Sequence, residues 1–383
     1  MKFDSSSQTN TMQITIVQGA FLPVPPIRGG AIEKIWKQLG EYFVTKGHSV
    51  THVSRLCDDL PKESTEKGVR HIRVKGADCP RSLLWLKWLD LLYTIRVSRI
   101  LTESDIVVTN TFWAPVLFNP KRHGKIWVHI ARYPKYQFSF YRRASRLQSV
   151  STPIANALAD QAPGLASRIC MIANPLPYTV PDWNFDQKAS GEVLFVGRIH
   201  PEKGVDLLIR AVTRLKSRFK HIKCNLVGPW KVDQGGGGSS YLNTLKTLIT
   251  QIDAPVSITG PIFDEKQLRA YYRSASIFVY PSLAEKGEAS PLAPLEAMAE
   301  GCPVIVSDMS CFDDAVGEGK HAQRFDFRAK YRERLLSDCI AWWLDNEPAR
   351  KEASRSANTR AKLFELPRIA DQYLAEFESL LGK

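Results

Sequence analysis

The stretch from residue 276 to residue 308 constrains the fold of this chain more than any other. Residues 276–282, SIFVYPS, form an apolar run that is typical of a buried strand ending in a turn. After Pro291, the pattern LAPLEAMAE places its apolar residues at helical spacing, Gly301 ends the pattern, and PVIVS is a further short apolar strand. A strand, a loop, a helix and a strand in this order predict an α/β protein with a parallel sheet.

Two carboxylates stand on either side of the predicted helix start. Glu288 falls in the loop after the strand, and Glu296 falls about one turn inside the helix. The free N–H groups of the first helical turn face the loop, and α/β proteins bind phosphate at such places. The alternative interpretation is that both glutamates are solvated charges near a helix end.

A second loop of the same kind lies about 90 residues earlier. Residues 192–196 form a strand, residues 197–204 form a loop, and an amphipathic helix begins at Val205. This loop is basic, because it holds Arg198 and Lys203. Two strand-to-helix loops, one acidic and one basic, are suited to a phosphorylated ligand that is rich in hydroxyl groups.

These motifs resemble a known family. VGRIHPEKG, followed by Glu288 and Glu296 with seven residues between them and then by AMAEGCPVIVSD, is similar to the nucleotide-sugar-dependent, retaining glycosyltransferases of family 4. The resemblance runs from about Met12 to Leu381. It implies the GT-B fold, in which two Rossmann-like βαβ domains face each other across a cleft and a C-terminal helix crosses back to the first domain.

The length of 383 residues also predicts two domains. We expect a disordered tail at 1–11, an acceptor-binding domain at 12–180 and a nucleotide-sugar-binding domain at 190–365. The linker lies near 176–190, and the returning helix covers 366–383. The glycine-rich segment 231–240 lacks the Lys-Ser/Thr pair of a P-loop, so we expect a flexible surface hairpin there.

The resemblance also assigns roles to residues. It implies that Arg198 and Lys203 neutralise the diphosphate, that Glu296 binds the ribose, and that Glu288 binds the donor sugar. The remaining residues assigned to the donor are Gly29, Gly30, Gly228, Ser290 and Leu292. Pro291 departs from the family pattern, which commonly has glycine there, and it removes one N–H donor from the loop. The hydroxyl group of Ser290 is the expected substitute.

His129 ends a predicted strand of the first domain, where the family keeps a histidine that faces the donor sugar. Its implied role is to orient the sugar or the acceptor. The alternative is a core histidine that is hydrogen-bonded to the backbone. No Asp-x-Asp motif ends a strand, so we expect an enzyme without a metal and with no cofactor beyond its co-substrate, a UDP- or GDP-linked sugar.

The implied reaction is the transfer of a hexosyl group to a hydroxyl of a glycan or of a lipid-linked acceptor in the synthesis of envelope polysaccharide or glycolipid. A GT-B sugar-nucleotide epimerase is the nearest alternative. A non-catalytic protein that binds nucleic acid or another anion is a more distant one, because the chain has no recognised nucleic-acid-binding module, and we expect no nucleic-acid partner.

The composition fits a protein of the cytoplasm. Seven scattered cysteines without a C-x-x-C pair argue for a reducing compartment. The first residues lack the apolar core of a signal peptide, and no apolar run approaches the length of a membrane span.

The charge of the chain is unevenly distributed. Residues 1–185 hold 24 Lys and Arg against 13 Asp and Glu, whereas the rest of the chain is nearly neutral. The first half also contains a Leu- and Trp-rich helix at 82–101 and an aromatic, basic segment at 132–146. These features predict docking on an anionic membrane surface. The alternative is that the Leu and Trp side chains pack in the core and the basic residues are a solvated face.

Overall fold

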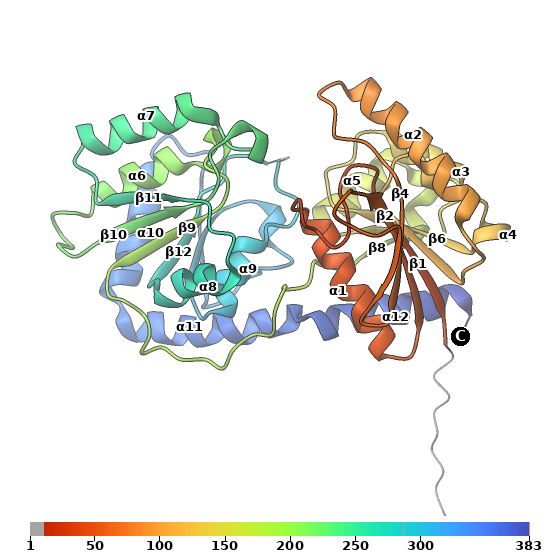
Figure 1. Cartoon of the computed structure of the whole chain (residues 1–383). Helices are drawn as coiled ribbons and strands as arrows, with labels where there is room; N and C mark the ends of the chain where they lie inside the picture. The colour runs from red at the N-terminus through yellow and green to blue at the C-terminus, as the bar shows by residue number, and fades with distance from the viewer. Residues whose placement is uncertain (1–10, 286, 383) are drawn as a thin grey trace, which may run out of the picture. The chain divides into compact units, whose positions relative to one another are not determined.

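The computed structural model describes residues 11–285 and 287–382, so the predicted tail at 1–11 lies almost entirely outside the described residues. The chain forms two compact units (Figure 1). The first unit holds the chain up to Pro177 together with the chain from Leu366 onward, and the second unit is Tyr178–Glu365. The divisions predicted from the sequence are at 180–190 and at 366.

The first unit is built on one sheet with the strand order β3-β4-β2-β1-β5-β6-β7-β8. All neighbouring strands are parallel except β3 and β4, which pair antiparallel at one edge. The strands are β1 (Gln13–Val17), β2 (Ser49–Leu56), β3 (Glu63–Glu66), β4 (Val69–Lys75), β5 (Ile106–Thr109), β6 (Lys125–Ile130), β7 (Arg146–Ser149) and β8 (Ile169–Met171).

The helices of the first unit include one from the far end of the sequence. They are α1 (Ala31–Thr45), α2 (Leu83–Ile100), α3 (Ala114–Leu117), α4 (Pro120–His123), α5 (Thr152–Gln161) and α12 (Leu366–Leu381), with short 3₁₀ turns at η1 (Gln137–Phe140) and η2 (Pro163–Arg168). Helix α12 lies beside α1 (Figure 1). The rings of Trp36 and Tyr373 meet at 5.1 Å between centroids, so the last helix completes the core of the first unit.

Helix α2 does not bury its apolar N-terminal end. Its buried residues are Asp90, Tyr93, Thr94 and Val97. By contrast, the first turns of the helix are exposed: Leu83, Leu84, Trp85 and Trp88 have relative exposures of 65%, 82%, 54% and 49%. The alternative in which these four side chains fill the core is therefore wrong.

The second unit is a fully parallel sheet with the order β11-β10-β9-β12-β13-β14. Its strands are β9 (Glu192–Val196), β10 (Lys223–Val227), β11 (Val256–Gly260), β12 (Ile277–Tyr280), β13 (Val304–Ser307) and β14 (Ala322–Phe325). Strands β9 and β12 are neighbours, with Phe278 opposite Leu194. Since parallel strands end at the same edge of a sheet, the basic loop after β9 and the acidic loop after β12 leave the sheet side by side.

The main helices of this unit are α6 (Val205–Thr213), α7 (Gly238–Gln251), α8 (Glu265–Ser274), α9 (Leu292–Ala299), α10 (Arg332–Asp345) and α11 (Glu347–Ala361). The shorter turns are η3 (Pro201–Lys203), η4 (Val232–Gln234), η5 (Ser310–Phe312) and η6 (Lys362–Phe364). The prediction of a hairpin at 231–240 is wrong. This segment joins β10 to α7, and it packs on the basic loop through a hydrogen bond from Gly237 N to Ile199 O at 2.9 Å.

Within the residues that the structure describes, no helix is both long enough and apolar enough to traverse a bilayer.

Candidate functional site

The acidic and basic loops of the second unit meet through a buried ion pair between Lys203 Nζ and Glu288 Oε1. The two side chains are only 4% and 6% exposed. Ser282 Oγ donates to the same carboxylate oxygen at 2.7 Å, and the ring of Tyr280 lies 5.6 Å from Lys203 Nζ. A charge buried to this degree needs such partners, because its desolvation is otherwise costly.

A glycine allows the two loops to approach this closely. Gly204 closes the basic loop with a φ of 63°, in the left-handed region that favours glycine. A Cβ atom at this position would collide with the carbonyl oxygen of Pro281, which precedes the acidic loop. Gly204 was not among the predicted site residues, although the sequence shows a glycine just before an amphipathic helix.

Arg198 differs from Lys203 because its side chain is 41% exposed. Its Nη2 atom lies 2.6 Å from Glu202 Oε1, and its Nη1 atom donates to Gly235 O at 2.8 Å. The guanidinium group is thus held between a carboxylate and the glycine-rich segment. Glu202 was missed in the sequence analysis, although a carboxylate four residues after an arginine was a visible signal.

Glu296, on α9, is held by a tyrosine from the preceding helix. Tyr272 Oη donates to Glu296 Oε2 at 2.9 Å, and Tyr178 Oη donates to the Glu296 backbone carbonyl at 3.4 Å. Burial, together with the Glu296 charge, raises the pKa of the Tyr272 phenol well above its ordinary value. Neither tyrosine was identified from sequence, because nothing local marks it.

Three further residues predicted to bind the donor lie in the same unit. Helix α9 begins at Leu292, with Pro291 as its N-cap and no side-chain hydrogen bond from that cap, and Ser290 lies just before it. Gly228 follows β10 with a φ of 149°, and a Cβ atom there would collide with Gly197 O. Close packing of two loops at the sheet edge therefore requires a glycine at position 228.

Gly29 and Gly30 lie in the first unit, directly before α1. Their φ angles are 78° and 116°, which a side chain rarely permits. A Cβ atom on Gly30 would collide with the carboxylate of Glu33, which lies in the first turn of α1 and is buried. Burial raises the pKa of Glu33. The structure therefore places a carboxylate beside the two glycines that the family resemblance assigns to the donor.

His129 also lies in the first unit, at 4% exposure. Its Nδ1 atom is 2.5 Å from Gln148 Oε1, while Gln148 Nε2 donates to the backbone carbonyls of Ser149 and Ile172. The Gln148 oxygen must therefore accept, so His129 carries its proton on Nδ1. Burial lowers the pKa of His129 to about 4, which makes the ring neutral at pH 7. The alternative of a core histidine is right that His129 is buried, but its hydrogen-bond partner is the side chain of Gln148 and not the backbone.

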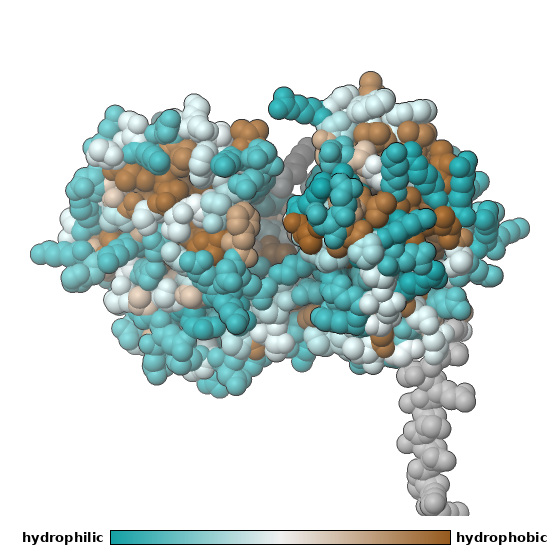
Figure 2. Space-filling view, viewed as in Figure 1, coloured by the Kyte–Doolittle hydropathy of each residue, from teal (hydrophilic) through white to brown (hydrophobic). Residues whose placement is uncertain are grey.

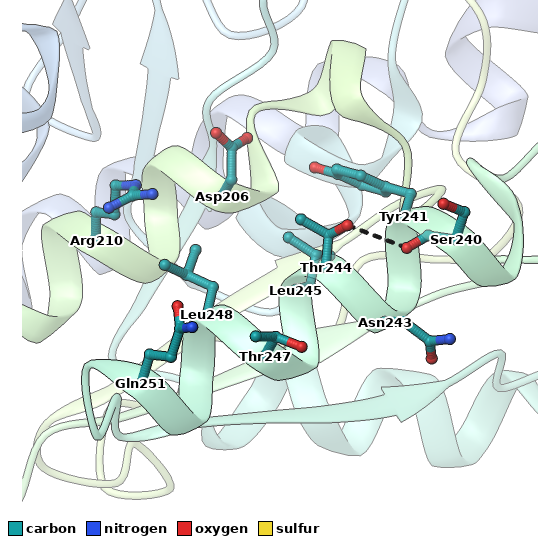
Figure 3. A pocket seen from close by; sticks show the side chains of 10 residues that line it. All are labelled: Asp206, Arg210, Ser240, Tyr241, Asn243, Thr244, Leu245, Thr247, Leu248 and Gln251. Atoms are coloured by element: carbon teal, nitrogen blue, oxygen red, sulfur yellow. Dashed lines mark hydrogen bonds between the residues drawn. The ribbon is translucent and has the colours of Figure 1, made fainter.

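A separate groove of about 610 Å³ lies between α6 and α7 (Figure 3). Asp206 and Arg210 line it from α6, and side chains such as Tyr241, Thr244 and Gln251 line it from α7. None of the residues predicted to bind the donor lines this groove. Among residues 11–285 and 287–382, no group of three or more His, Cys, Asp or Glu side chains is arranged to hold a metal ion.

The architecture defines the class of protein. The chain aligns over most of its length with GT-B structures, including Anabaena HepE in complex with UDP and glucose (TM-score 0.72, 17% identity, 96% of this chain and 100% of that one). Sucrose-phosphate synthase from Thermosynechococcus elongatus is similar to the same degree (TM-score 0.72, 17% identity, 97% and 99%). The fold is therefore GT-B, with two Rossmann-like domains.

The comparison with known families concerns the second unit. Residues 184–360 match the family described as glycosyl transferases group 1, and this match supports the resemblance to family 4 glycosyltransferases. D-inositol 3-phosphate glycosyltransferase from Streptomyces avermitilis is 34% identical over 33% of this chain, but the match covers only 27% of that relative. Spore coat protein SA from Bacillus subtilis is 23% identical over 96% of this chain and 99% of its own length.

Proposed function

We propose that this protein is a retaining glycosyltransferase that moves a hexosyl group from a UDP- or GDP-linked sugar to a hydroxyl of a glycan or of a lipid-linked acceptor. The observation that carries the proposal is the contact between the basic loop and the acidic loop in a domain that matches glycosyl transferases group 1. HepE, which has the same fold, has been solved in complex with UDP and with UDP-glucose. A similar relative is called phosphatidyl-myo-inositol mannosyltransferase, which supports a glycolipid acceptor.

In this proposal, different residues of the second unit bind different parts of the nucleotide-sugar donor. Arg198, the more exposed cation, meets the diphosphate and stabilises the charge that grows on the leaving phosphate, with Lys203 beside it. Glu288 accepts hydrogen bonds from hydroxyls of the donor sugar and favours positive charge at the anomeric carbon. Glu296 accepts hydrogen bonds from the ribose hydroxyls.

The reaction that we propose retains the anomeric configuration and needs no metal. The bond between the anomeric carbon and the phosphate oxygen breaks, a bond to the acceptor oxygen forms on the same face, and the acceptor proton passes to the leaving phosphate. The Nε2 atom of the neutral His129 ring is a buried acceptor without a hydrogen-bond partner among the described residues, and this suits it to receive a hydrogen bond from a sugar or acceptor hydroxyl.

The test is a panel of UDP- and GDP-linked hexoses offered with glycan and lipid-linked acceptors. We expect one donor to give a glycoside with the anomeric configuration of the donor, as read by NMR, and turnover to survive EDTA. A product of inverted configuration, or activity lost in EDTA and restored by manganese, would contradict those parts of the proposal. Conversion of the donor without any acceptor would favour the epimerase.

We further propose that the first unit docks on the anionic, cytoplasmic face of a membrane, where a lipid-linked acceptor would lie. Apolar side chains are gathered over α2 in the surface view (Figure 2), and Trp85 and Trp88 are about half exposed. Tyr136 and Phe140, from the aromatic, basic segment, are 78% and 68% exposed. Exposed aromatic rings favour the interface of a bilayer, and nearby basic residues contribute about 1 kcal/mol each on an anionic leaflet.

Co-sedimentation with vesicles tests this docking. We expect binding to vesicles that contain phosphatidylglycerol, little binding to neutral vesicles, and weaker binding at high salt. Replacing Trp85 and Trp88 by Ser should reduce the bound fraction. Trp342→Ser is the matched control, because Trp342 is 45% exposed in the other unit. Equal loss in both variants, or equal recovery with both lipids, would favour a soluble acceptor.

A further inference from the structure

A buried hydroxyl group holds one oxygen of the Glu296 carboxylate. Tyr272 lies on α8 and is 1% exposed, and its Oη atom donates to Glu296 Oε2 at 2.9 Å. Because burial and the neighbouring carboxylate raise the pKa of this phenol, the hydroxyl keeps its proton at any physiological pH. A charge-assisted hydrogen bond from a rigid donor restricts the rotation of the carboxylate.

Tyr272 is itself held in place by the core. Its ring packs against Phe278 with 5.7 Å between centroids. Its backbone carbonyl accepts a hydrogen bond from Lys188 Nζ at 3.1 Å, and the same ammonium group donates to Glu300 O at 2.8 Å. The Tyr272 hydroxyl group is therefore held by its own surroundings and does not follow movements of the Glu296 side chain.

The end of α9 is anchored to the same helix. Glu300, whose side chain is 1% exposed, lies 2.5 Å from Arg269 Nε and 3.1 Å from Arg273 Nε, both on α8. Buried charges with several partners keep two elements in a fixed register. Helix α8 thus supports both the backbone and the candidate ribose-binding side chain of α9.

We propose that Tyr272 is a positioning residue that sets the orientation in which Glu296 meets the donor ribose, and thereby the preference for ribonucleotide over 2′-deoxyribonucleotide donors. This inference rests on the proposed function. A carboxylate has about four acceptor positions, so a bond from Tyr272 does not exhaust it. Recognition of two adjacent ribose hydroxyls requires the remaining positions to point in fixed directions.

The experiment measures the dissociation constants of UDP, GDP, 2′-deoxy-UDP and 2′-deoxy-GDP by calorimetry. We expect the wild type to prefer the ribose form of the nucleotide that it binds by about tenfold or more, because a missing hydroxyl leaves a charged acceptor unsatisfied. Tyr272→Phe should reduce this ratio about fivefold, which corresponds to about 1 kcal/mol of coupling between neighbours. The structure offers a matched control in Ser282→Ala, which removes a buried hydroxyl from Glu288 and should leave the ratio unchanged.

Two further variants test the inference if circular dichroism shows that Tyr272→Phe folds poorly. Glu296→Asp withdraws the carboxylate from Tyr272 without altering the core, and it should also lower the ratio. In a Glu296→Ala background, where Tyr272 has no side-chain acceptor at position 296 to orient, adding Tyr272→Phe should change the ratio no further.

The possible outcomes distinguish failure of the inference on Tyr272 from failure of the proposed function. If Tyr272→Phe or Glu296→Asp keeps the wild-type ratio, or if Ser282→Ala shifts it equally, Tyr272 does not position a ribose-binding group. If the wild type binds the ribose and deoxyribose forms equally well, the inference is wrong, while a nucleotide-sugar donor remains supported. If the wild type binds neither nucleotide, the proposed function is contradicted, and the inference fails with it.

Discussion

The two units each bury a carboxylate, but they stabilise it in opposite ways. In the first unit, Asp90 is 4% exposed, and its Oδ2 atom accepts hydrogen bonds from the backbone N–H groups of Phe112 and Trp113 at 3.1 and 3.2 Å. Burial raises the pKa of Asp90 to about 6. In the second unit, the equally buried Glu288 receives the ammonium group of Lys203 and the hydroxyl of Ser282.

The difference separates a structural carboxylate from a candidate catalytic one. Backbone dipoles satisfy the hydrogen bonds of Asp90 but do not cancel its charge, so this residue ties α2 to the loop after β5 and titrates near neutral pH. Lys203 balances the charge of Glu288 inside the protein. Such a balanced pair is suited to a site that must accept a diphosphate and a hydroxyl-rich sugar together.

Among the variants that test this comparison, Lys203→Ala should have the largest effect on stability. Removing one partner of a buried pair leaves the other charge unpaired, so we expect the free energy of unfolding to fall by about 3–5 kcal/mol at pH 8. Turnover should fall about 10²- to 10³-fold.

Urea unfolding at pH 8 measures the effect of Lys203→Ala. Lys203→Met is the control, because it keeps most of the apolar volume while removing the charge, and it should also be strongly destabilised. A variant as stable as the wild type at pH 8 would mean that the buried pair does not balance Glu288.

Asp90→Asn removes the carboxylate whose charge the backbone N–H groups do not cancel. Because the folded-state pKa of Asp90 is raised, its contribution to stability is greatest below pH 4 and is lost as the pH rises to about 6. The asparagine oxygen can still accept both backbone bonds. The stability of the variant relative to the wild type should therefore increase by up to about 3 kcal/mol between pH 4 and pH 7. A difference that does not vary with pH would show that Asp90 stays ionised.

Ser282→Ala removes the second donor to Glu288 while leaving the ion pair in place. Hydrogen bonds to charged groups contribute roughly 1.5–3 kcal/mol, and we expect the lower end of this range because Lys203 still holds the same oxygen. Thermal unfolding at pH 7 measures the change. Ser282→Cys, which keeps a weak donor, should fall between the wild type and the alanine variant, and an unchanged melting temperature for alanine would contradict the role of this hydroxyl.

Arg198→Ala should have the smallest effect on stability. Its pair with Glu202 is partly exposed, and such pairs contribute about 0–1 kcal/mol. Turnover should nevertheless fall about 10²-fold or more, because the role that we propose for Arg198 is to stabilise the charge on the leaving phosphate. Steady-state rates at saturating donor, measured beside a melting curve, separate the two effects, and near-normal turnover would remove Arg198 from the diphosphate site.

The sequence by itself determined the local architecture. Apolar runs and helical spacing indicated the strands and helices on which the candidate residues lie, because side-chain periodicity follows backbone geometry. The spacing of Glu288 and Glu296, and the placement of Arg198 and Lys203 between a strand and a helix, are local features, and they carry the resemblance to family 4 glycosyltransferases. The Leu- and Trp-rich segment was identified as a helix for the same reason.

The tertiary structure decided which of these groups meet. Lys203 and Glu288 are 85 residues apart, and they touch because β9 and β12 are neighbours in the sheet. The assignment of Tyr272 to Glu296, the burial of Asp90 and the outward direction of Trp85 likewise depend on how whole elements pack. No local pattern contains this information, since the partner of a side chain is set by strand order and helix rotation, which the entire core fixes at once.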